Sequence, residues 1–215
     1  MISKRAFFTA QYTSTDNALY VFGGSDSNTS DLAACEKFSL LENVWRPIAP
    51  MRTAKNGLAS VSFEAYRLIF VFGGNTHTSG SLSQIEKYEI DFDKWTVTSV
   101  KLSKPLHDMS LLPMARDKVM VFGGHTDGSQ GGPNNEVQVV DLTSECFRAR
   151  FGSDKLYLPG AGGKTYFPPQ YDSASGKVSL LFGYCDKAPA LEDFDMSEFN
   201  SFATPSAGRS RSLAS

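Results

Sequence analysis

Short apolar runs that end in two glycines recur along the chain at a constant interval. Residues 19–24 (LYVFGG), 69–74 (IFVFGG) and 119–124 (VMVFGG) are three such runs, and each begins 50 residues after the one before. A looser fourth run occupies residues 177–183. Because self-similarity at a period of this order indicates a repeat architecture, the chain is predicted to contain four repeats of one structural unit.

The polar and apolar positions within one repeat predict four β-strands. In the second repeat, residues 57–63 and 85–90 alternate, residues 67–72 are almost continuously apolar, and residues 95–100 are rich in β-branched side chains. Alternation is typical of a strand with one wet face, and a short continuous apolar run of a strand buried on both faces. We therefore predict an all-β fold of four four-stranded sheets stacked face to face. In the first repeat, residues 5–11 are expected to form the first strand.

The glycine pairs and the tryptophans are expected to be structural positions of the repeat. A glycine pair directly after the buried strand tolerates positive φ and lets a neighbouring group approach the backbone closely. We expect the recurring tryptophan to be that neighbour. The structural positions predicted in this way are Gly23, Gly24, Gly73, Gly74, Gly123, Gly124, Trp45 and Trp95.

Composition and charge narrow the function classes. The 215 residues include 21 Lys and Arg against 23 Asp and Glu, so the formal net charge of -2 offers no basic field to attract nucleic acid or an anionic membrane. Three widely spaced cysteines without a CxxC pair predict free thiols in a reducing compartment. No apolar run approaches the roughly 18 residues of a membrane span, so we expect a cytoplasmic protein with no membrane partner.

These residues resemble the kelch repeat, in which a hydrophobic run ending in Gly-Gly precedes a Glu-x-aromatic motif and then a tryptophan. Here the Glu-x-aromatic motifs are at residues 36–38 and 86–88, and Trp45 and Trp95 follow them. The third and fourth repeats depart from the pattern, with Gln138 for the aromatic residue, Glu145 for the tryptophan and Tyr184 for the second glycine. The resemblance implies a kelch-type β-propeller over residues 1–202. Its blades would span residues 4–51, 52–101, 102–152 and 153–202. The small, polar residues 203–215 are expected to form a flexible tail.

The number of repeats raises the question of ring closure. The resemblance implies a propeller, yet kelch propellers usually have more than four blades, so the expected outcomes are a closed four-bladed ring or an incomplete ring. An incomplete ring would expose a blade face at each end. Either a larger complex or an oligomer is then expected to cover these faces, in the cytoplasm or in association with the cytoskeleton, or the chain is one piece of a longer protein.

Function is expected in the loops that the blades position. The loops after the glycine pairs are polar, and in related kelch proteins they form a face that grips a protein partner together with the loops that lead into each first strand. Arg5 and Lys55 are 50 residues apart and are expected near the channel mouth, where a cation could bind a carboxylate or be paired within the fold. The candidate binding residues are Arg5, Lys55, Ser25, Asp26, Asn75, His77, His125 and Asp127.

No catalytic residue, metal ligand or cofactor is predicted. His77 and His125 fall in equivalent loops but lack a carboxylate at ligand spacing, and His107-Asp108 lacks a nucleophile motif. Residues 160–165 (GAGGKT) end like a P-loop, but Leu158 and the following prolines do not fit one. The leading hypothesis is a non-enzymatic protein-binding or scaffolding module. The alternatives are the substrate-recognition propeller of a ubiquitin-ligase adaptor, suggested by residues 45–57, and a propeller enzyme acting on a small molecule.

Overall fold

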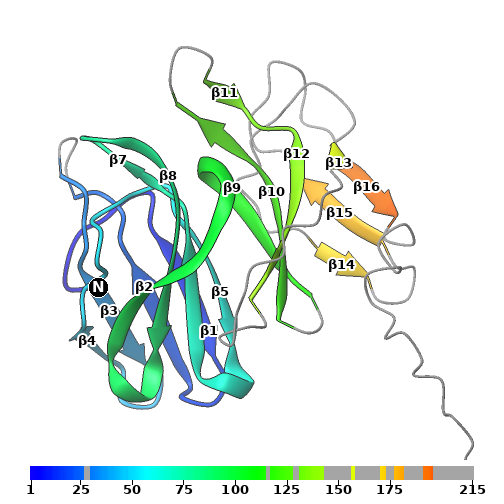
Figure 1. The fold of residues 1–215 in the computed structure, drawn as a ribbon. Helices are drawn as coiled ribbons and strands as arrows, with labels where there is room; N and C mark the ends of the chain where they lie inside the picture. Colours follow the sequence, from blue (N-terminus) through cyan, green and yellow to red (C-terminus); the bar gives the residue numbers. More distant parts are fainter. Residues whose placement is uncertain are drawn as a thin grey trace, which may run out of the picture.

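The computed structural model describes residues 1–26, 30–114, 117–127 and 131–142, together with the backbone of four later strands at 156–157, 170–172, 177–181 and 191–195. Antiparallel β-sheets account for nearly all of the regular structure (Figure 1). The expected all-β fold is therefore confirmed, although four complete blades are not.

The first repeat folds as one four-stranded antiparallel sheet, which we call blade one. Its strands are β1 (Thr9–Thr13), β2 (Ala18–Phe22), β3 (Cys35–Ser39) and β4 (Val44–Ile48), and they lie in that order. The first strand begins at Thr9, four residues later than the start expected from the sequence. Arg5 therefore precedes the sheet, and its side chain reaches Glu36 at the beginning of β3.

The second and third repeats, together with β13 at the start of the fourth, form one continuous nine-stranded sheet instead of two separate blades. Its main path is β13-β12-β10-β9-β8-β6-β5, and β7 and β11 pair at its edge. The strands are β5 (Ala59–Phe63), β6 (Leu68–Phe72), β7 (Asn75–Thr76), β8 (Gly80–Glu89), β9 (Lys94–Pro113), β10 (Lys118–Thr126), β11 (Gly132–Pro133), β12 (Glu136–Asp141) and β13 (Leu156–Tyr157).

The two repeats merge through β9, which has 20 residues and pairs with β8 on one side and β10 on the other. The sequence predicted an outer strand at 95–100 and a separate first strand for the third repeat, and this separation is wrong. Two register shifts, between Leu82, Gln84 and Glu86, mark where β9 leaves one blade for the next. We call the part around β5, β6 and β8 blade two and the part around β10 and β12 blade three.

The fourth repeat supplies a three-stranded sheet in the described residues. It has the order β14 (Gln170–Asp172), β15 (Lys177–Leu181) and β16 (Leu191–Asp195). The fourth strand expected near Phe202 and the tail at 203–215 lie outside the described residues. So do Glu145, Tyr184 and the P-loop-like residues 160–165.

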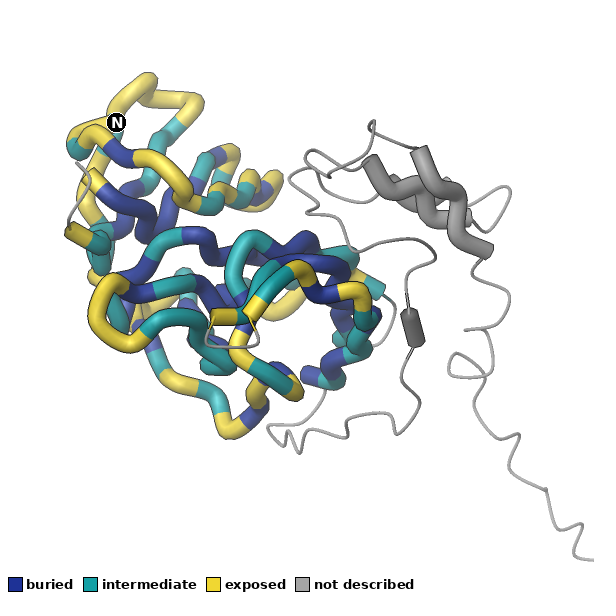
Figure 2. The backbone as a smooth tube through the Cα atoms, turned by 90° about the horizontal axis from the view of Figure 1, so that it is seen from above, coloured by how far each residue is buried: buried dark blue, intermediate teal, exposed yellow. Residues whose placement is uncertain are grey.

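Two hydrophobic layers hold neighbouring blades together. The buried stretches of the strands that supply them are dark blue in Figure 2. Between blades one and two the layer is aromatic, because Tyr20 and Phe22 of β2 meet Tyr88 and Trp95. Between blades two and three it is mainly aliphatic around Phe70 and Phe72. Alternation along β6 therefore supplies both interfaces, with Ile69 and Val71 on one side and Phe70 and Phe72 on the other, as a doubly buried run predicts.

The glycine pairs bring neighbouring blades into backbone contact. Gly23 has φ +61° and Gly73 has φ +50°, and a Cβ at these positions would lie 2.7 Å from the Lys55 carbonyl oxygen and 2.3 Å from the Leu106 carbonyl oxygen. The next glycine in each pair, Gly24 or Gly74, donates its N–H to the same carbonyl at 2.9 Å. The neighbour is thus the backbone of the following blade. The expectation that tryptophan would fill this place is wrong.

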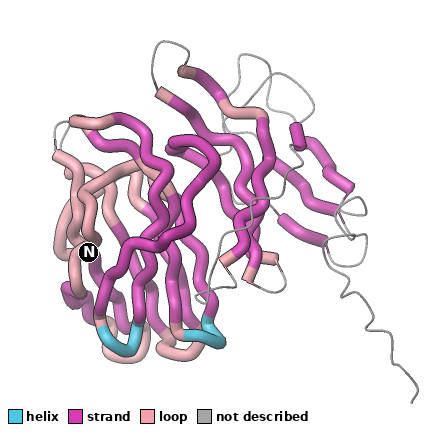
Figure 3. Tube along the Cα trace, in the orientation of Figure 1, coloured by secondary structure: helices cyan, strands magenta, loops and turns pink. Residues whose placement is uncertain are grey.

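The described sheets have two different rims. At one rim, tight turns connect consecutive strands, and the 3₁₀ helices η1 (Glu64–Tyr66) and η2 (Ile90–Phe92) lie there, in cyan in Figure 3. At the opposite rim lie the longer connections after the glycine pairs, including the β7–β8 and β10–β11 hairpins. Among the described residues, no helix is both long and apolar enough to cross a membrane.

Candidate functional site

The rim with the long connections carries most of the residues that the sequence singled out, and we call it the hairpin rim. Residues 75–84 were expected to be a polar loop, but most of them form the β7–β8 hairpin. His125 likewise lies in β10, opposite His107 in β9 and Pro133 in β11. Main-chain pairing therefore orders a rim for which the sequence predicted only polar loops.

Asp31 and His77 join the hairpin rims of blades one and two. His77 donates its backbone N–H to Asp31 Oδ2 at 2.8 Å, and its Nδ1 lies 2.8 Å from Asp31 Oδ1. Asn56 donates its side-chain N–H to the same carboxylate at 2.6 Å. Burial alone would raise the pKa of the Asp31 carboxyl, but these hydrogen bonds hold it below its ordinary value.

An equivalent set of hydrogen bonds recurs 50 residues later, between blades two and three, and we call each set a clasp. In the second clasp the carboxylate lies on the opposite partner. Ser81 occupies the place of Asp31, and Asp127 occupies the place of His77. The backbone N–H and the hydroxyl of Ser81 both donate to Asp127 Oδ2 at 2.6 Å, and the Asn75 side chain donates to it at 2.7 Å. The pKa of Asp127 is lowered mainly by the hydrogen bonds from Ser81. The charge of His107 lowers it further.

Phe7 is an exposed aromatic residue in a strained backbone conformation on this rim. Its side chain is 66% exposed and its φ is +54°, in the left-handed region that bulky residues rarely adopt. Its carbonyl accepts the N–H of Gly57, whose φ is +58°, and the Gly57 carbonyl accepts the N–H of Asp108 in the next blade. Phe7 is not among the residues selected from the sequence, although it lies 50 residues before Gly57, at the equivalent position of the repeat.

Arg5 and Lys55 are buried inside the sheets and paired with glutamates of their own repeats. Arg5 Nη2 lies 2.6 Å from Glu36 Oε1, and Lys55 Nζ lies 2.9 Å from Glu86 Oε1, with both cationic side chains 0% exposed. Arg5 also donates to the Gly23 and Ala34 carbonyls at 2.7 Å. The expected channel-mouth cations are thus internal structural pairs, and the geometry corrects their assignment as partner-binding residues.

Burial affects the pKa values of these pairs in opposite directions. It lowers the pKa of the Lys55 ammonium, and the neighbouring Glu86 carboxylate opposes that effect. For Glu36, burial raises the pKa, but the N–H groups of Ile2 and Ser3 and the Arg5 guanidinium bring it below its ordinary value. A third pair, between Lys104 and Glu136 at 3.0 Å, occupies the corresponding place in blade three and is partly exposed. The nearly constant spacing from each cation to its glutamate was a signal that could have revealed the pairs.

The remaining candidates are partly tied into the fold. Ser25 is buried and exchanges two backbone hydrogen bonds with Ala6 at 2.8 and 2.9 Å. Asp26 is exposed at the rim. Trp95 is buried and donates its indole N–H to the Ala49 carbonyl of blade one at 2.8 Å. Trp45 packs on Phe38 with ring centroids 5.0 Å apart and stays half-buried.

His107 lies near a nucleophile that the sequence analysis did not find, but the hydrogen-bond order does not suit catalysis. Ser81 Oγ is 2.8 Å from His107 Nδ1 and 2.6 Å from Asp127 Oδ2. The single hydroxyl proton goes to the carboxylate, so the imidazole must donate to the serine oxygen and cannot act as its general base. The described residues also contain no group of three His, Cys, Asp or Glu side chains that could hold a metal ion.

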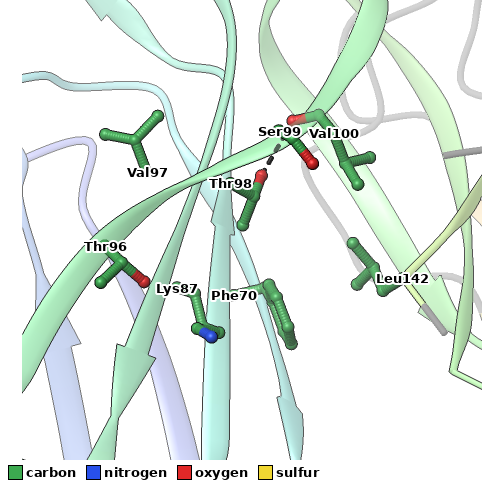
Figure 4. Close-up of a pocket in the computed structure, with 8 residues that line it drawn as sticks. All are labelled: Phe70, Lys87, Thr96, Val97, Thr98, Ser99, Val100 and Leu142. Atoms are coloured by element: carbon green, nitrogen blue, oxygen red, sulfur yellow. Dashed lines mark hydrogen bonds between the residues drawn. The ribbon is translucent and has the colours of Figure 1, made fainter. Parts of the chain in front are cut away.

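A small cavity lies away from the hairpin rim, at the place where β9 leaves β8. Its volume is about 220 Å³, and Phe70, Lys87, Thr98 and Leu142 are among its lining residues (Figure 4). Thr98 donates its hydroxyl hydrogen to the Val100 carbonyl at 2.8 Å across one wall. Ligand pockets are typically about 300 Å³ or larger, so this cavity is better explained by the register shifts of the two strands than by a ligand.

Comparison with known proteins agrees with the repeat pattern. Residues 10–52, which include all of β2, β3 and β4, match the model of the family described as the kelch motif. No curated protein gives a significant match. Kelch motifs generally mediate protein–protein interaction, and kelch-repeat proteins are typically binding modules without enzymatic activity. The chain thus carries a kelch motif in its first blade, and this match supports its assignment as a kelch-repeat protein.

Proposed function

We propose that this chain is a protein-binding module whose hairpin rim holds a segment of a partner protein, as a scaffold within a larger complex. The observation that carries the proposal is the exposed Phe7 beside a rim whose loops are already joined by side-chain hydrogen bonds. A strained, exposed aromatic residue is a candidate anchor, because strain of this kind is concentrated at functional sites and aromatic side chains dominate interface energetics. Loops that are ordered before binding lose less entropy when the partner binds.

The other candidate functions receive less support. The ubiquitin-ligase adaptor hypothesis rests on the resemblance of residues 45–57, and Lys55 within that segment is buried on Glu86. The enzyme hypothesis needs converging reactive groups, and the Ser81–His107 contact has the wrong donor order. Three widely spaced cysteines favour a reducing compartment, so we place the proposed function in the cytoplasm.

The Phe7→Gly variant tests the proposal directly. Glycine occupies the equivalent position 57 with nearly the same φ, so the variant should fold as well as the wild type or better while losing the aromatic anchor. Affinity purification from the native cell, followed by quantitative mass spectrometry, should recover partners with the wild-type chain and about tenfold less of them with Phe7→Gly.

Phe92→Ala is the matched control, since Phe92 is 75% exposed but lies in η2 on the opposite rim. It should recover the same partners as the wild type. Equal recovery by Phe7→Gly and the wild type would overturn the assignment of the hairpin rim.

A further inference from the structure

Within the described residues, the part of one face of blade one around Trp45 is only partly covered, although the equivalent part of blade two is buried, and we call it the open face. Its side chains include those of Tyr12, Leu19, Phe38 and Trp45, which pair with one another in a row across the four strands. Tyr12 is 49% exposed, and the other three are half-buried. The residues of blade two that correspond to Leu19, Phe38 and Trp45 are 0–2% exposed because they pack on blade one; they are Ile69, Tyr88 and Trp95.

Hydrogen bonding shows the same asymmetry. Trp95 Nε1 donates to the Ala49 carbonyl of blade one, whereas Trp45 Nε1 meets no acceptor within the described part of the chain. Gly57 donates its N–H to the Phe7 carbonyl, whereas the N–H of Phe7 finds no acceptor among the described residues. The open face therefore presents apolar side chains together with donors whose counterparts in blade two are satisfied by a neighbouring blade.

The repeat itself defines what would fit. Blade two is covered by a middle strand that presents Tyr20 and Phe22, beside the Ala49 carbonyl. The chain repeats these middle-strand positions as Phe70 and Phe72, and then as Met120 and Phe122, and all four side chains are at most 6% exposed. The next copy in the sequence is Leu180 and Phe182, in the fourth repeat. By the sequence pattern alone, we expect these two positions to be the copy that another blade would receive.

The arrangement of the sheets favours an intermolecular contact. Blade one and the sheet β14–β16 lie at opposite ends of the structure (Figure 1). We propose that the open face of blade one binds the fourth repeat of a second copy of this chain, so that two copies join head to tail. Head-to-tail contacts form a ring when the rotation closes, and two copies with four repeats each would reach the upper end of the usual range of about 4–8 propeller blades. The side chains that carry this contact, Tyr12 and Trp45, are separate from the Phe7 side chain that carries the hairpin-rim proposal.

Trp45→Arg is the first test, because it places a charge in the centre of the open face. Sedimentation velocity of the full chain between about 1 and 100 µM should show a dimer for the wild type, by mass action, and at least about tenfold weaker association for Trp45→Arg. Tyr12→Arg should also weaken association. Because Tyr12 is half exposed, this substitution should not disrupt folding. Phe92→Arg, on the rim of tight turns, is the control and should dimerise like the wild type.

A complementation experiment distinguishes head-to-tail association from contact between two open faces. Leu180→Arg changes the other side of the proposed contact and should also be monomeric. A mixture of the Trp45→Arg and Leu180→Arg chains should form a heterodimer, because one intact contact remains. A wild type that stays monomeric, a Leu180→Arg chain that dimerises normally, or a mixture that fails to associate would each overturn the proposal. A Trp45→Arg chain that loses stability without any change in mass would instead indicate closure within one chain.

Discussion

At the scale of single residues, the buried cations have a structural role that their repeat spacing alone did not reveal. Lys55 and Glu86 have side chains that are both 0% exposed, and the backbone N–H of Arg52 also donates to Glu86 at 2.8 Å. Two charges removed from water depend on each other, because either one left alone would be buried without compensation. In the Glu-x-aromatic motif, the glutamate therefore pairs with a buried cation, and the aromatic residue packs at the interface between blades.

Lys55→Met is expected to lower the free energy of unfolding by about 3–5 kcal/mol, because it leaves the Glu86 carboxylate buried and unpaired. Urea denaturation followed by fluorescence measures this change. The double variant Lys55→Met/Glu86→Gln should recover at least half of the loss, since no charge remains and the amide oxygen still accepts the Arg52 N–H. Lys104→Met, at the partly exposed pair, should cost about 1 kcal/mol or less. Equal losses at the two lysines would contradict the buried-pair account.

At the scale of elements, the hairpin rim is held by a clasp that is repeated with different chemistry. Asp31 accepts from His77 and Asn56 between blades one and two, and Asp127 accepts from Ser81 and Asn75 between blades two and three. In each case a carboxylate joins loops from neighbouring blades. The hairpins are therefore ordered by contacts across the blade boundaries as well as by their own strand pairing.

The depressed pKa of Asp31 predicts an acid-sensitive clasp. A carboxyl group whose pKa is lower in the folded state contributes stability above its unfolded pKa of about 3.9 and loses that contribution as the pH falls through the folded pKa. The stability difference between the wild type and Asp31→Asn should therefore shrink as the pH falls from about 5 to about 2. Urea denaturation across this range measures it. Asp127→Asn should behave in the same direction, and a difference independent of pH would rule out the clasp.

At the scale of the whole molecule, position in the stack decides what a repeated residue does. Trp45 and Trp95 occupy the same place in their repeats, yet among the described residues only Trp95 packs on another blade. Likewise β9 joins blades two and three into one sheet, whereas blade one keeps its own four strands. Units that are similar in sequence therefore differ in burial, in hydrogen bonding and in the boundaries between them.

Trp95→Ala should cost about 3–5 kcal/mol of unfolding free energy, because it empties the aromatic layer and removes the donor to the Ala49 carbonyl. Trp45→Ala should cost less than half as much in dilute solution, where the open face has no partner. Urea denaturation at low protein concentration compares the two variants. Similar costs would mean that the open face is covered within a single chain.

Much of the fold could be predicted because it follows from local patterns. The apolar runs before the glycine pairs became β2, β6 and β10, and the alternating residues 85–90 lie largely in β8. Boundaries were less predictable. Nothing local ends β9 at residue 101, since both of its halves have neighbours to pair with. At the candidate site, the sequence selected Asn75, His77 and Asp127 but missed Asp31 and Ser81, whose roles depend on loops about 46 residues away.

The sequence by itself determined the repeat, its strands and the positions that must be glycine, because strand alternation and left-handed backbone geometry act over a few residues. Only the tertiary structure decided which side chains those repeats bring together. It buried Arg5 and Lys55 on glutamates, joined two blades through one strand, exposed Phe7 on an ordered rim, and left Trp45 half-buried where Trp95 is fully buried. These outcomes depend on which blade lies next to which, and contact between segments distant in the sequence is a property of the assembled sheets.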